Sequence, residues 1–388
     1  MKRILFVALS ATLLAVGCQK TEIINRVGDT MVFTTEMNKL TKASGDQDAA
    51  KEGIVNLQAQ DFKVWAYSAY EDLNNDVNYG DVYDEMEALD VTYDGTKWGT
   101  EIEYYWPGTD KSLDFFAVST KKAYYVPAGT GENPTPEVAG VNVVPTGGGA
   151  ATIGQRSMTV SGYVVDHNNP NDDLMVAEFV RQHQGQNNKR VNLNFKHALA
   201  KVIFKFRTSE AQTGEVAPTV IVKSLKVEDL TTDGTLTVTE TAENYGEVDA
   251  TRVKVALNWT APATPTTQTF VDDYTEEYEF AADVTHDATD KTAMLLTTQA
   301  EEFATWLVMP QNIEERKVSI TYVINKREFT NIFSLSKGNL KSWDINQAIT
   351  YTVTLAPNVI SFNPSVEEWT NYDADPETEG NQDVDMMN

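Results

Sequence analysis

The sequence predicts an all-β chain built from antiparallel sheets, and three observations support this. Apolar and polar residues alternate with period two in segment after segment, as at 62–67, where Phe62, Val64 and Ala66 alternate with Lys63, Trp65 and Tyr67. Asp-Gly pairs at 94–95 and 233–234 indicate tight turns between such segments. No long stretch has helical periodicity, apart from a short turn expected at 81–89.

The expected strands follow one another along the whole chain. The first is 30–35, and a polar segment without apolar periodicity, 36–53, follows it and is expected to form a loop. The remaining candidate strands are 62–67, 91–93, 97–98, 104–107, 113–119, 174–177, 191–195, 202–206, 220–227, 236–238, 253–259, 306–309, 318–324, 351–355 and 359–369. One-sided alternation is typical of sandwiches with one packed face. Two sandwiches account for the 388 residues.

We expect four regions. Residues 1–17 form a signal peptide, 30–186 an N-terminal β-sandwich domain and 187–370 a C-terminal one, with the polar segment 182–190 as their connection. Residues 371–388 form an acidic tail with six carboxylates and no basic residue, a composition typical of disorder.

The N-terminus has the pattern of a bacterial lipoprotein signal. Lys2 and Arg3 precede an apolar stretch that is too short to span a membrane, and small residues precede Cys18. Cys18 is the only cysteine, so it has no disulfide partner within the chain and suits acylation. An ordinary secretory signal is the alternative. We expect a mature protein that begins at Cys18 and is held at a membrane by lipid.

Composition argues against several functions. The formal net charge is −26, or −28 without the signal peptide, which disfavours nucleic acid as a partner. The histidines at 167, 183, 197 and 286 lack metal-ligand spacing, so we expect no metal site and no cofactor. The acidic segments 72–81 and 168–173 could bind calcium but fit solvated turns better. Most of the seven tryptophans are expected in cores or at the domain junction. Catalytic motifs are absent from the sequence, and we expect no enzyme.

Short stretches spread over the mature chain resemble the fimbrillin family, the subunits of type V pili in Bacteroides-like bacteria. They are the lipobox ending at Cys18, Met31-Val32-Phe33, the segment 62–67, the segment 104–107 leading to 113–117, the segment 173–177, the segment 191–202, and the end through 360–362 and 366–369. The resemblance implies two transthyretin-like β-sandwich domains and export to the outer membrane as a lipoprotein.

The resemblance also implies assembly by strand exchange. A trypsin-like protease cuts after the first strand of polymerising subunits, and a terminal strand of the neighbouring subunit then takes its place. Here the removable strand would include Met31, Val32 and Phe33, and the cut would fall at Lys39, Lys42 or Lys51. The best-known processing in the family is at arginine, and none lies between Arg26 and Arg156. Anchor-type members stay uncut and lipidated.

The donor strand would be 359–369, with Ile360, Phe362 and Val366 as candidate residues, although Pro364 removes a ladder donor. This segment could equally be the ordinary last strand of its sheet. We expect a structural or adhesive fimbrial subunit whose partners are other fimbrial subunits and the outer membrane. The alternative is a surface glycan-binding lipoprotein of a nutrient-uptake system, which an exposed array of aromatic residues would favour.

Overall fold

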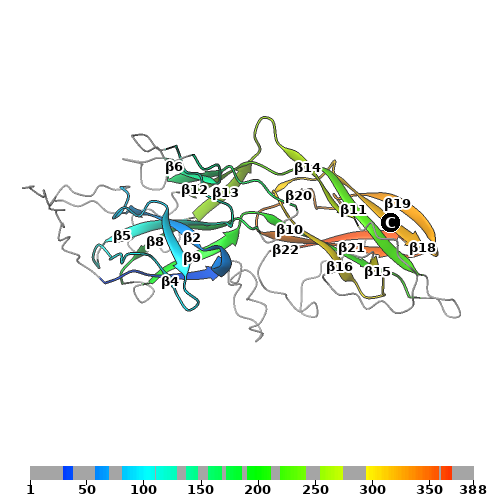
Figure 1. Cartoon of the computed structure of the whole chain (residues 1–388), viewed down its shortest axis with the longest axis horizontal. Helices are drawn as coiled ribbons and strands as arrows, with labels where there is room; N and C mark the ends of the chain where they lie inside the picture. The colour runs from blue at the N-terminus through cyan, green and yellow to red at the C-terminus, as the bar shows by residue number, and fades with distance from the viewer. Residues whose placement is uncertain are drawn as a thin grey trace, which may run out of the picture.

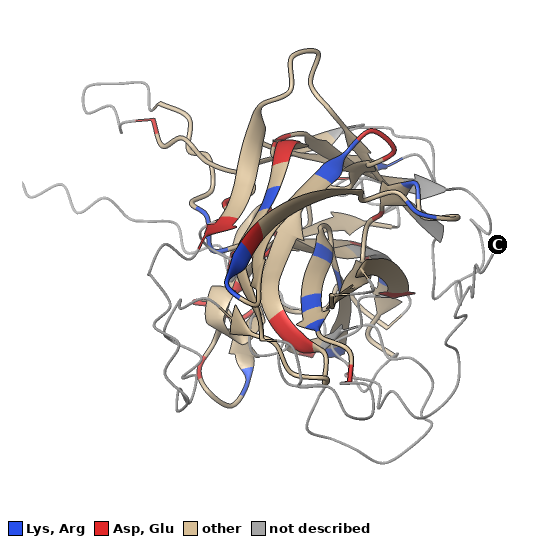
Figure 2. Cartoon of the chain, turned by 90° about the vertical axis from the view of Figure 1, so that its right-hand side faces the viewer, with Lys and Arg blue, Asp and Glu red and all other residues tan. Residues whose placement is uncertain are grey.

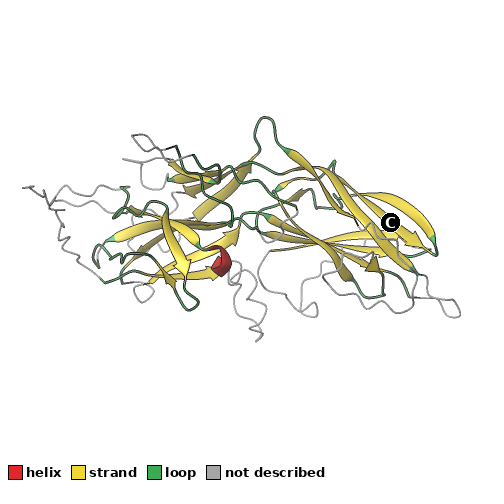
Figure 3. Ribbon diagram, viewed as in Figure 1, coloured by secondary structure: helices red, strands yellow, loops and turns green. Residues whose placement is uncertain are grey.

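The computed structural model describes residues 29–37, 57–69, 81–109, 111–128, 137–146, 156–167, 172–185, 190–210, 219–241, 254–273, 294–357 and 360–368. Over these residues the chain consists of strands, turns and loops, with one helical turn at 57–60 (Figure 3). The prediction of an all-β chain is confirmed. The helical turn expected at 81–89 is wrong, because Asp84, Glu85 and Ala88 have positive φ values that a right-handed helix excludes.

A seven-stranded sheet occupies the left part of Figure 1, in the order β1-β9-β8-β5-β2-β3-β4. Its neighbours are antiparallel except β1, which runs parallel to β9. The strands are β1 (Val32–Met37), β2 (Phe62–Ser68), β3 (Leu89–Tyr93), β4 (Trp98–Gly99), β5 (Ser112–Ser119), β8 (Met175–His183) and β9 (Arg190–His197).

A four-stranded sheet in the order β13-β12-β7-β6 packs against one face of the first sheet. Its strands are β6 (Asn142–Thr146), β7 (Ser157–Ser161), β12 (Thr235–Thr241) and β13 (Lys254–Thr260). The last two come from the second half of the sequence, yet β12 pairs with β7 in antiparallel register. These two sheets form what we call the N-terminal group.

The right part of Figure 1 contains a second pair of sheets, which we call the C-terminal group. One sheet has the order β16-β10-β21-β22, with β10 (Ala200–Arg207), β16 (Glu301–Val308), β21 (Gln347–Leu355) and β22 (Ile360–Glu368). The other has the order β14-β11-β18-β19, with β11 (Val220–Thr231), β14 (Thr267–Asp273), β18 (Lys317–Ile324) and β19 (Arg327–Ser334), and β15 (Met294–Leu295) also pairs with β11. A small ribbon joins β17 (Gln311–Asn312) and β20 (Ser342–Trp343).

The two groups of sheets do not divide at the predicted boundary between residues 186 and 187. The segment 182–190 lies between β8 and β9, which pair within one sheet, and is therefore not an inter-domain connection. The chain passes to the C-terminal group only after β9, returns for β12 and β13, and then crosses again. A polar loop looks the same in sequence whether it closes a hairpin or links two domains. The transthyretin-like character of the two groups stays a prediction. The predicted acidic tail, residues 371–388, lies outside the described residues.

The first sheet is covered on both faces, whereas the sequence suggested one packed face. Phe62, Val64 and Ala66 of β2 belong to one apolar cluster, while Trp65 and Tyr67 point to another. All eight residues of β5 are buried. The predicted alternation of side chains between the two faces is therefore present in β2. The face expected to be polar, however, carries aromatic residues, which contact the four-stranded sheet.

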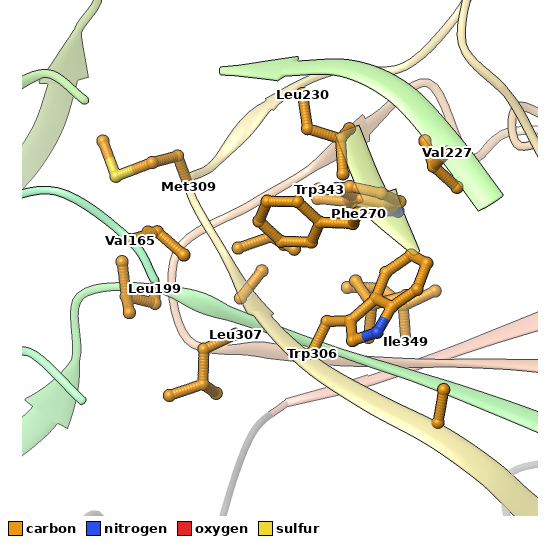
Figure 4. Packing of buried hydrophobic residues seen from close by; sticks show 14 of the residues in the cluster. Val165, Leu199, Val227, Leu230, Phe270, Trp306, Leu307, Met309, Trp343 and Ile349 are labelled. Atoms are coloured by element: carbon orange, nitrogen blue, oxygen red, sulfur yellow. The ribbon is translucent and has the colours of Figure 1, made fainter. Parts of the chain in front are cut away.

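One apolar cluster runs without interruption from the N-terminal group into the C-terminal group. Val165, which follows β7, lies close to Leu199 just before β10 and to Met309 just beyond β16 (Figure 4). Trp259 of β13 donates a hydrogen bond from Nε1 to the Ala198 carbonyl, at 2.6 Å. Apolar packing thus holds the two groups together, and the hydrogen bond attaches β13 to the short segment between β9 and β10.

The tight turn predicted at Asp94-Gly95 is confirmed. Asp94 Oδ1 accepts hydrogen bonds from the Thr96 hydroxyl (2.7 Å), the Thr96 amide (2.8 Å) and the Lys97 amide (2.9 Å). These bonds, chiefly that from the Thr96 hydroxyl, lower the pKa of Asp94 to about 2. Gly95 has a φ of +97°, which glycine adopts readily.

Candidate assembly interface

The first strand completes an apolar layer of the N-terminal group. Met31, just before β1, and Phe33 on β1 are 6% and 4% exposed, whereas Val32 between them is 42% exposed. The alternation follows from the pleat, which turns successive side chains to opposite faces. Met31 and Phe33 join the apolar cluster on the face of the sheet opposite to the four-stranded sheet.

We call the surroundings of these side chains the β1 seat, defined by Phe62, Trp98, Val191, Leu193 and Phe195. Phe62 lies at its centre, with ring centroids 6.5 Å from Phe33, 4.8 Å from Trp98 and 5.2 Å from Phe195. The seat thus combines side chains from β2, β4 and β9.

Two different sets of contacts hold the two sides of β1. On one side, all six residues of β1 pair with β9, from Val32 opposite Arg190 to Met37 opposite Phe195. On the other side the contacts are few: Trp98 Nε1 donates to the Thr35 hydroxyl at 3.0 Å, and the Met31 amide donates to the Tyr104 carbonyl at 2.7 Å. β1 therefore lies at the end of its sheet and bridges toward β4 at the other end.

Of the predicted first-strand residues, the structure places Met31, Val32 and Phe33 together at this edge. The predicted lipidation site, Cys18, and the predicted cleavage sites, Lys39, Lys42 and Lys51, lie outside the described residues. The described chain ends β1 at Met37 and resumes at Leu57.

The candidate donor strand, β22, lies at the edge of its own sheet and pairs with β21 from Ile360 opposite Leu355 to Glu368 opposite Gln347. Phe362 is 6% exposed and stacks on Phe333 and Tyr351, with centroid distances of 5.3 and 4.9 Å. Ile360 and Val366 are 41% and 43% exposed. Pro364 is compatible with this position, because an edge strand has one side without ladder bonds.

A buried charge cluster connects the two sheets of the N-terminal group, and sequence reasoning missed it. Asp114 on β5 is fully buried, and its carboxylate accepts hydrogen bonds from Arg181 Nε and Nη2 at 2.8 and 3.1 Å. Arg156 Nη2 lies 3.6 Å from the same carboxylate, and its guanidinium stacks over the Tyr67 ring at 4.4 Å. Burial raises the pKa of the Tyr67 hydroxyl, while Arg156 opposes this shift. A single acid within an apolar strand was the only cue in the sequence.

The described histidines have structural partners. His197 pairs with Asp173 in a buried contact, and its amide donates to Asn346 Oδ1 at 3.3 Å. His167 stacks on Phe270 at 4.7 Å, and its Nε2 lies 2.9 Å from the Val271 carbonyl. His286 lies outside the described residues. Within the described ranges no group of three or more potential ligands could hold a metal ion.

The predicted calcium segments are described only in part. Asp172 forms an ion pair with Lys122 at 2.7 Å, and Asp173 contacts His197, so both carboxylates are used within the fold. The rest of these two segments, apart from Asp81, lies outside the described residues.

The tryptophans contribute to the cores, as predicted. Five are 7% exposed or less: Trp65, Trp98, Trp106, Trp306 and Trp343. Trp259 lies at the junction of the two groups, and Trp369 is outside the described residues. The described tryptophans thus form no exposed aromatic array of the kind that the glycan-binding alternative requires. No helix in the described part of the chain is long and apolar enough to cross a membrane.

These features define an all-β protein with an edge strand that completes an apolar seat. Comparison with known families then identifies it: the chain belongs to the fimbrillin-like family, whose model matches residues 41–369. The family assignment shows a cell-surface fimbrial subunit and confirms the resemblance seen in the sequence.

One solved structure shows a similar fold, and another is a weaker match. A fimbrial protein from Bacteroides vulgatus ATCC 8482 is 17% identical, with a TM-score of 0.51, and the match covers 88% of this chain and 99% of that chain. A fimbrial assembly protein from Parabacteroides distasonis ATCC 8503 is 10% identical, with a TM-score of 0.36 and coverages of 88% and 100%. No curated protein matches the chain.

Proposed function

We propose that this chain is a non-enzymatic structural subunit of a type V fimbria that assembles by exchange of its first strand. The observation that carries the proposal is the position of β1, whose Met31 and Phe33 complete an apolar cluster at the end of a sheet. Removing this strand would leave the β9 backbone without its partner and the β1 seat open to water. A strand from another subunit would satisfy both needs at once.

For the donor we propose β22 of a second copy. Its Ile360-Ser361-Phe362 repeats the spacing of Met31-Val32-Phe33, with an apolar residue and a phenylalanine two positions apart. Phe362 would take the place of Phe33 in the seat. In the single chain β22 is the last strand of its own sheet, so donation would exchange one pairing for another.

Limited digestion tests the proposal. We expect trypsin to cut the Cys18→Ala protein between β1 and β2, at Lys39, Lys42 or Lys51, and to start concentration-dependent multimerisation, measured by light scattering and electron microscopy. The matched control replaces the three lysines by glutamine and is expected to keep β1 and to show no multimerisation in response to trypsin. A clipped protein that loses β1 and stays monomeric would contradict a shaft role and leave an anchor or tip role.

We further propose export as an outer-membrane lipoprotein acylated at Cys18, which the lipobox supports. We expect Cys18→Ala to abolish incorporation of labelled palmitate in cells and to move the protein from the membrane fraction. The charge-reversing Lys20→Glu variant is the control and should keep its label. Undiminished labelling of Cys18→Ala would refute acylation at this residue.

A further inference from the structure

The strand β19 is an open sheet edge of a different kind from β1. It pairs with β18 on one side only and ends the sheet. Six of its eight residues are exposed, among them Phe329 at 43%. Ile332, at 66%, has the largest exposed fraction among the large exposed hydrophobic residues in the described part of the chain.

Apart from β13, the other long edges in the described structure carry residues that discourage pairing with another chain. β13 has a charge only at its first residue, Lys254, but residues 256–260 of this strand include no exposed large hydrophobic side chain. Charges or prolines interrupt the remaining edges: Glu301 and Glu302 on β16, Asp272 and Asp273 on β14, Pro145 on β6 and Pro364 on β22. Proteins commonly protect edges in this way. The segment 329–334 of β19 has neither a charge nor a proline. An unprotected, apolar edge is a site for strand addition.

The hairpin before β19 fixes which backbone groups face outward. Asn325 and Lys326 form a two-residue turn with φ values of +47° and +70°, and Ile324 pairs with Arg327 across it. In such a hairpin the closing pair is hydrogen-bonded, and bonded pairs then alternate along the ladder. Arg327, Phe329, Asn331 and Phe333 therefore direct their backbone groups to β18. The backbone groups of the intervening residues, Glu328, Thr330, Ile332 and Ser334, point to the open side.

We propose that β19 pairs with β19 of a second copy of this chain, antiparallel about a two-fold axis at Asn331. In this register Thr330 lies opposite Ile332 of the partner, and Glu328 lies opposite Ser334. All four outward-directed residues are paired, which gives about eight N–H···O bonds. Shifting the register by two residues in either direction leaves one of the four outside the ladder. The β14-β11-β18-β19 sheets of the two copies would then form one continuous sheet.

The side chains suit this pairing on both faces. On the core face, Phe329 would lie opposite the partner's Phe333 and extend a row in which Tyr322 already stacks on Phe329 at 5.8 Å. Cross-strand aromatic pairs of this kind stabilise sheets. On the outer face, Ile332 would cover the partner's Thr330. The exposed apolar residues of β19 are thus the ones that the second copy covers.

Charge is also complementary. Lys317 lies opposite Ser334 within the chain, so the partner's Glu328 would lie on the far side of the same small serine. Glu328 already pairs with Lys223 of its own chain at 2.7 Å, so the partner's Lys317 would be a second cation beside an exposed carboxylate. The lysine side chain is long enough to reach over it, and the two-fold axis makes this contact twice. Figure 2 shows basic and acidic residues interspersed on the strands at this end, so a net charge of −26 does not prevent local contact.

The proposal gives a lateral contact between subunits that is independent of β1. It is therefore tested on uncut protein, in which strand exchange cannot take place. We expect the full mature Cys18→Ala chain to form a dimer with increasing concentration in sedimentation velocity. Ile332→Lys should abolish the dimer, and so should Thr330→Pro, since the Thr330 N–H points away from β18. Val144→Lys, at an exposed valine on the β6 edge, is the matched control and should leave it intact.

A disulfide tests the register. Residues facing each other in a non-hydrogen-bonded antiparallel pair have Cα atoms about 4.5 Å apart, within the range of a disulfide. Asn331→Cys in the Cys18→Ala background should therefore give an oxidised dimer, whereas Asn325→Cys should not. A protein that is monomeric at all concentrations, or a dimer that survives both edge variants, would overturn the proposal. The proposal would also be overturned if the β19 amides were protected from hydrogen exchange only in assembled fimbriae and not in the isolated protein. That result would assign the edge to a different fimbrial protein.

Discussion

Replacing Phe33 by alanine is expected to lower the free energy of unfolding by about 3–5 kcal/mol. The ring is 4% exposed and lies in the β1 seat beside Phe62. Alanine would remove the buried ring and leave a cavity that the paired backbone of β1 and β9 prevents from collapsing. Urea unfolding of the Cys18→Ala protein measures the change from the shift in midpoint.

The matched control is Val32→Ala on the same strand. Val32 is 42% exposed, so its truncation is expected to change stability by no more than about 0.5 kcal/mol. If the two variants were equally stable, β1 would not be part of the cooperative unit. In that case its removal could not drive exchange, and the proposed assembly mechanism would lose its physical basis.

Replacing Asp114 by alanine is expected to cost about 3–5 kcal/mol, because two guanidinium groups would lose their buried counter-charge. The side chain of Asp114 is fully buried, and those of Arg156 and Arg181 are 5% and 11% exposed. The cluster connects β5, β8 and the residue before β7, so the loss should be seen as a lower unfolding midpoint of the N-terminal group. Thermal unfolding with a tryptophan fluorescence readout measures it.

Asp90→Ala is the control for this second prediction. Asp90 is paired with Lys63 at 2.5 Å but its side chain is 74% exposed, and exposed pairs contribute only about 0–1 kcal/mol. The double variant Asp114→Leu with Arg181→Met should recover part of the loss, since it removes an uncompensated charge. If Asp114→Ala were as mild as Asp90→Ala, the cluster would not hold the two sheets together.

Local structure could be predicted from the sequence to a large extent. Period-two alternation located β2, β5, β9, β10, β18 and β21, and the Asp94-Gly95 turn is where the pair indicated. These features depend on neighbours in the chain, which the sequence shows directly. The tryptophan cores were predictable for the same reason, since most of the tryptophans stand at a definite position of a strand pattern.

Strand pairing could not be predicted, because it depends on residues far apart in the chain. Nothing near β12 indicates that it pairs with β7, and the polar segment 182–190 between β8 and β9 resembles a linker in sequence. The parallel pairing of β1 with β9 could not be predicted for the same reason, because these two strands are far apart in the sequence. Asp114, Arg156 and Arg181 are likewise remote from one another in sequence, so their cluster appears only when the sheets are assembled. The lipidation and cleavage residues stay predictions.

The most direct test of the central claim is to identify the strand that occupies the β1 seat after cleavage. In the single chain Thr34 lies opposite Asn192, so in the proposed exchange Asn363 of the donor takes the place of Thr34. Neighbouring strands are about 4.8 Å apart, which suits a disulfide. Asn192→Cys with Asn363→Cys, in the Cys18→Ala background, should therefore cross-link copies after trypsin treatment and not before. Thr34→Cys with Asn192→Cys, which should close within one uncut chain, shows that the geometry permits the bond. Multimers that form without the intermolecular disulfide, and with residues 29–37 still bound to β9, would contradict the account.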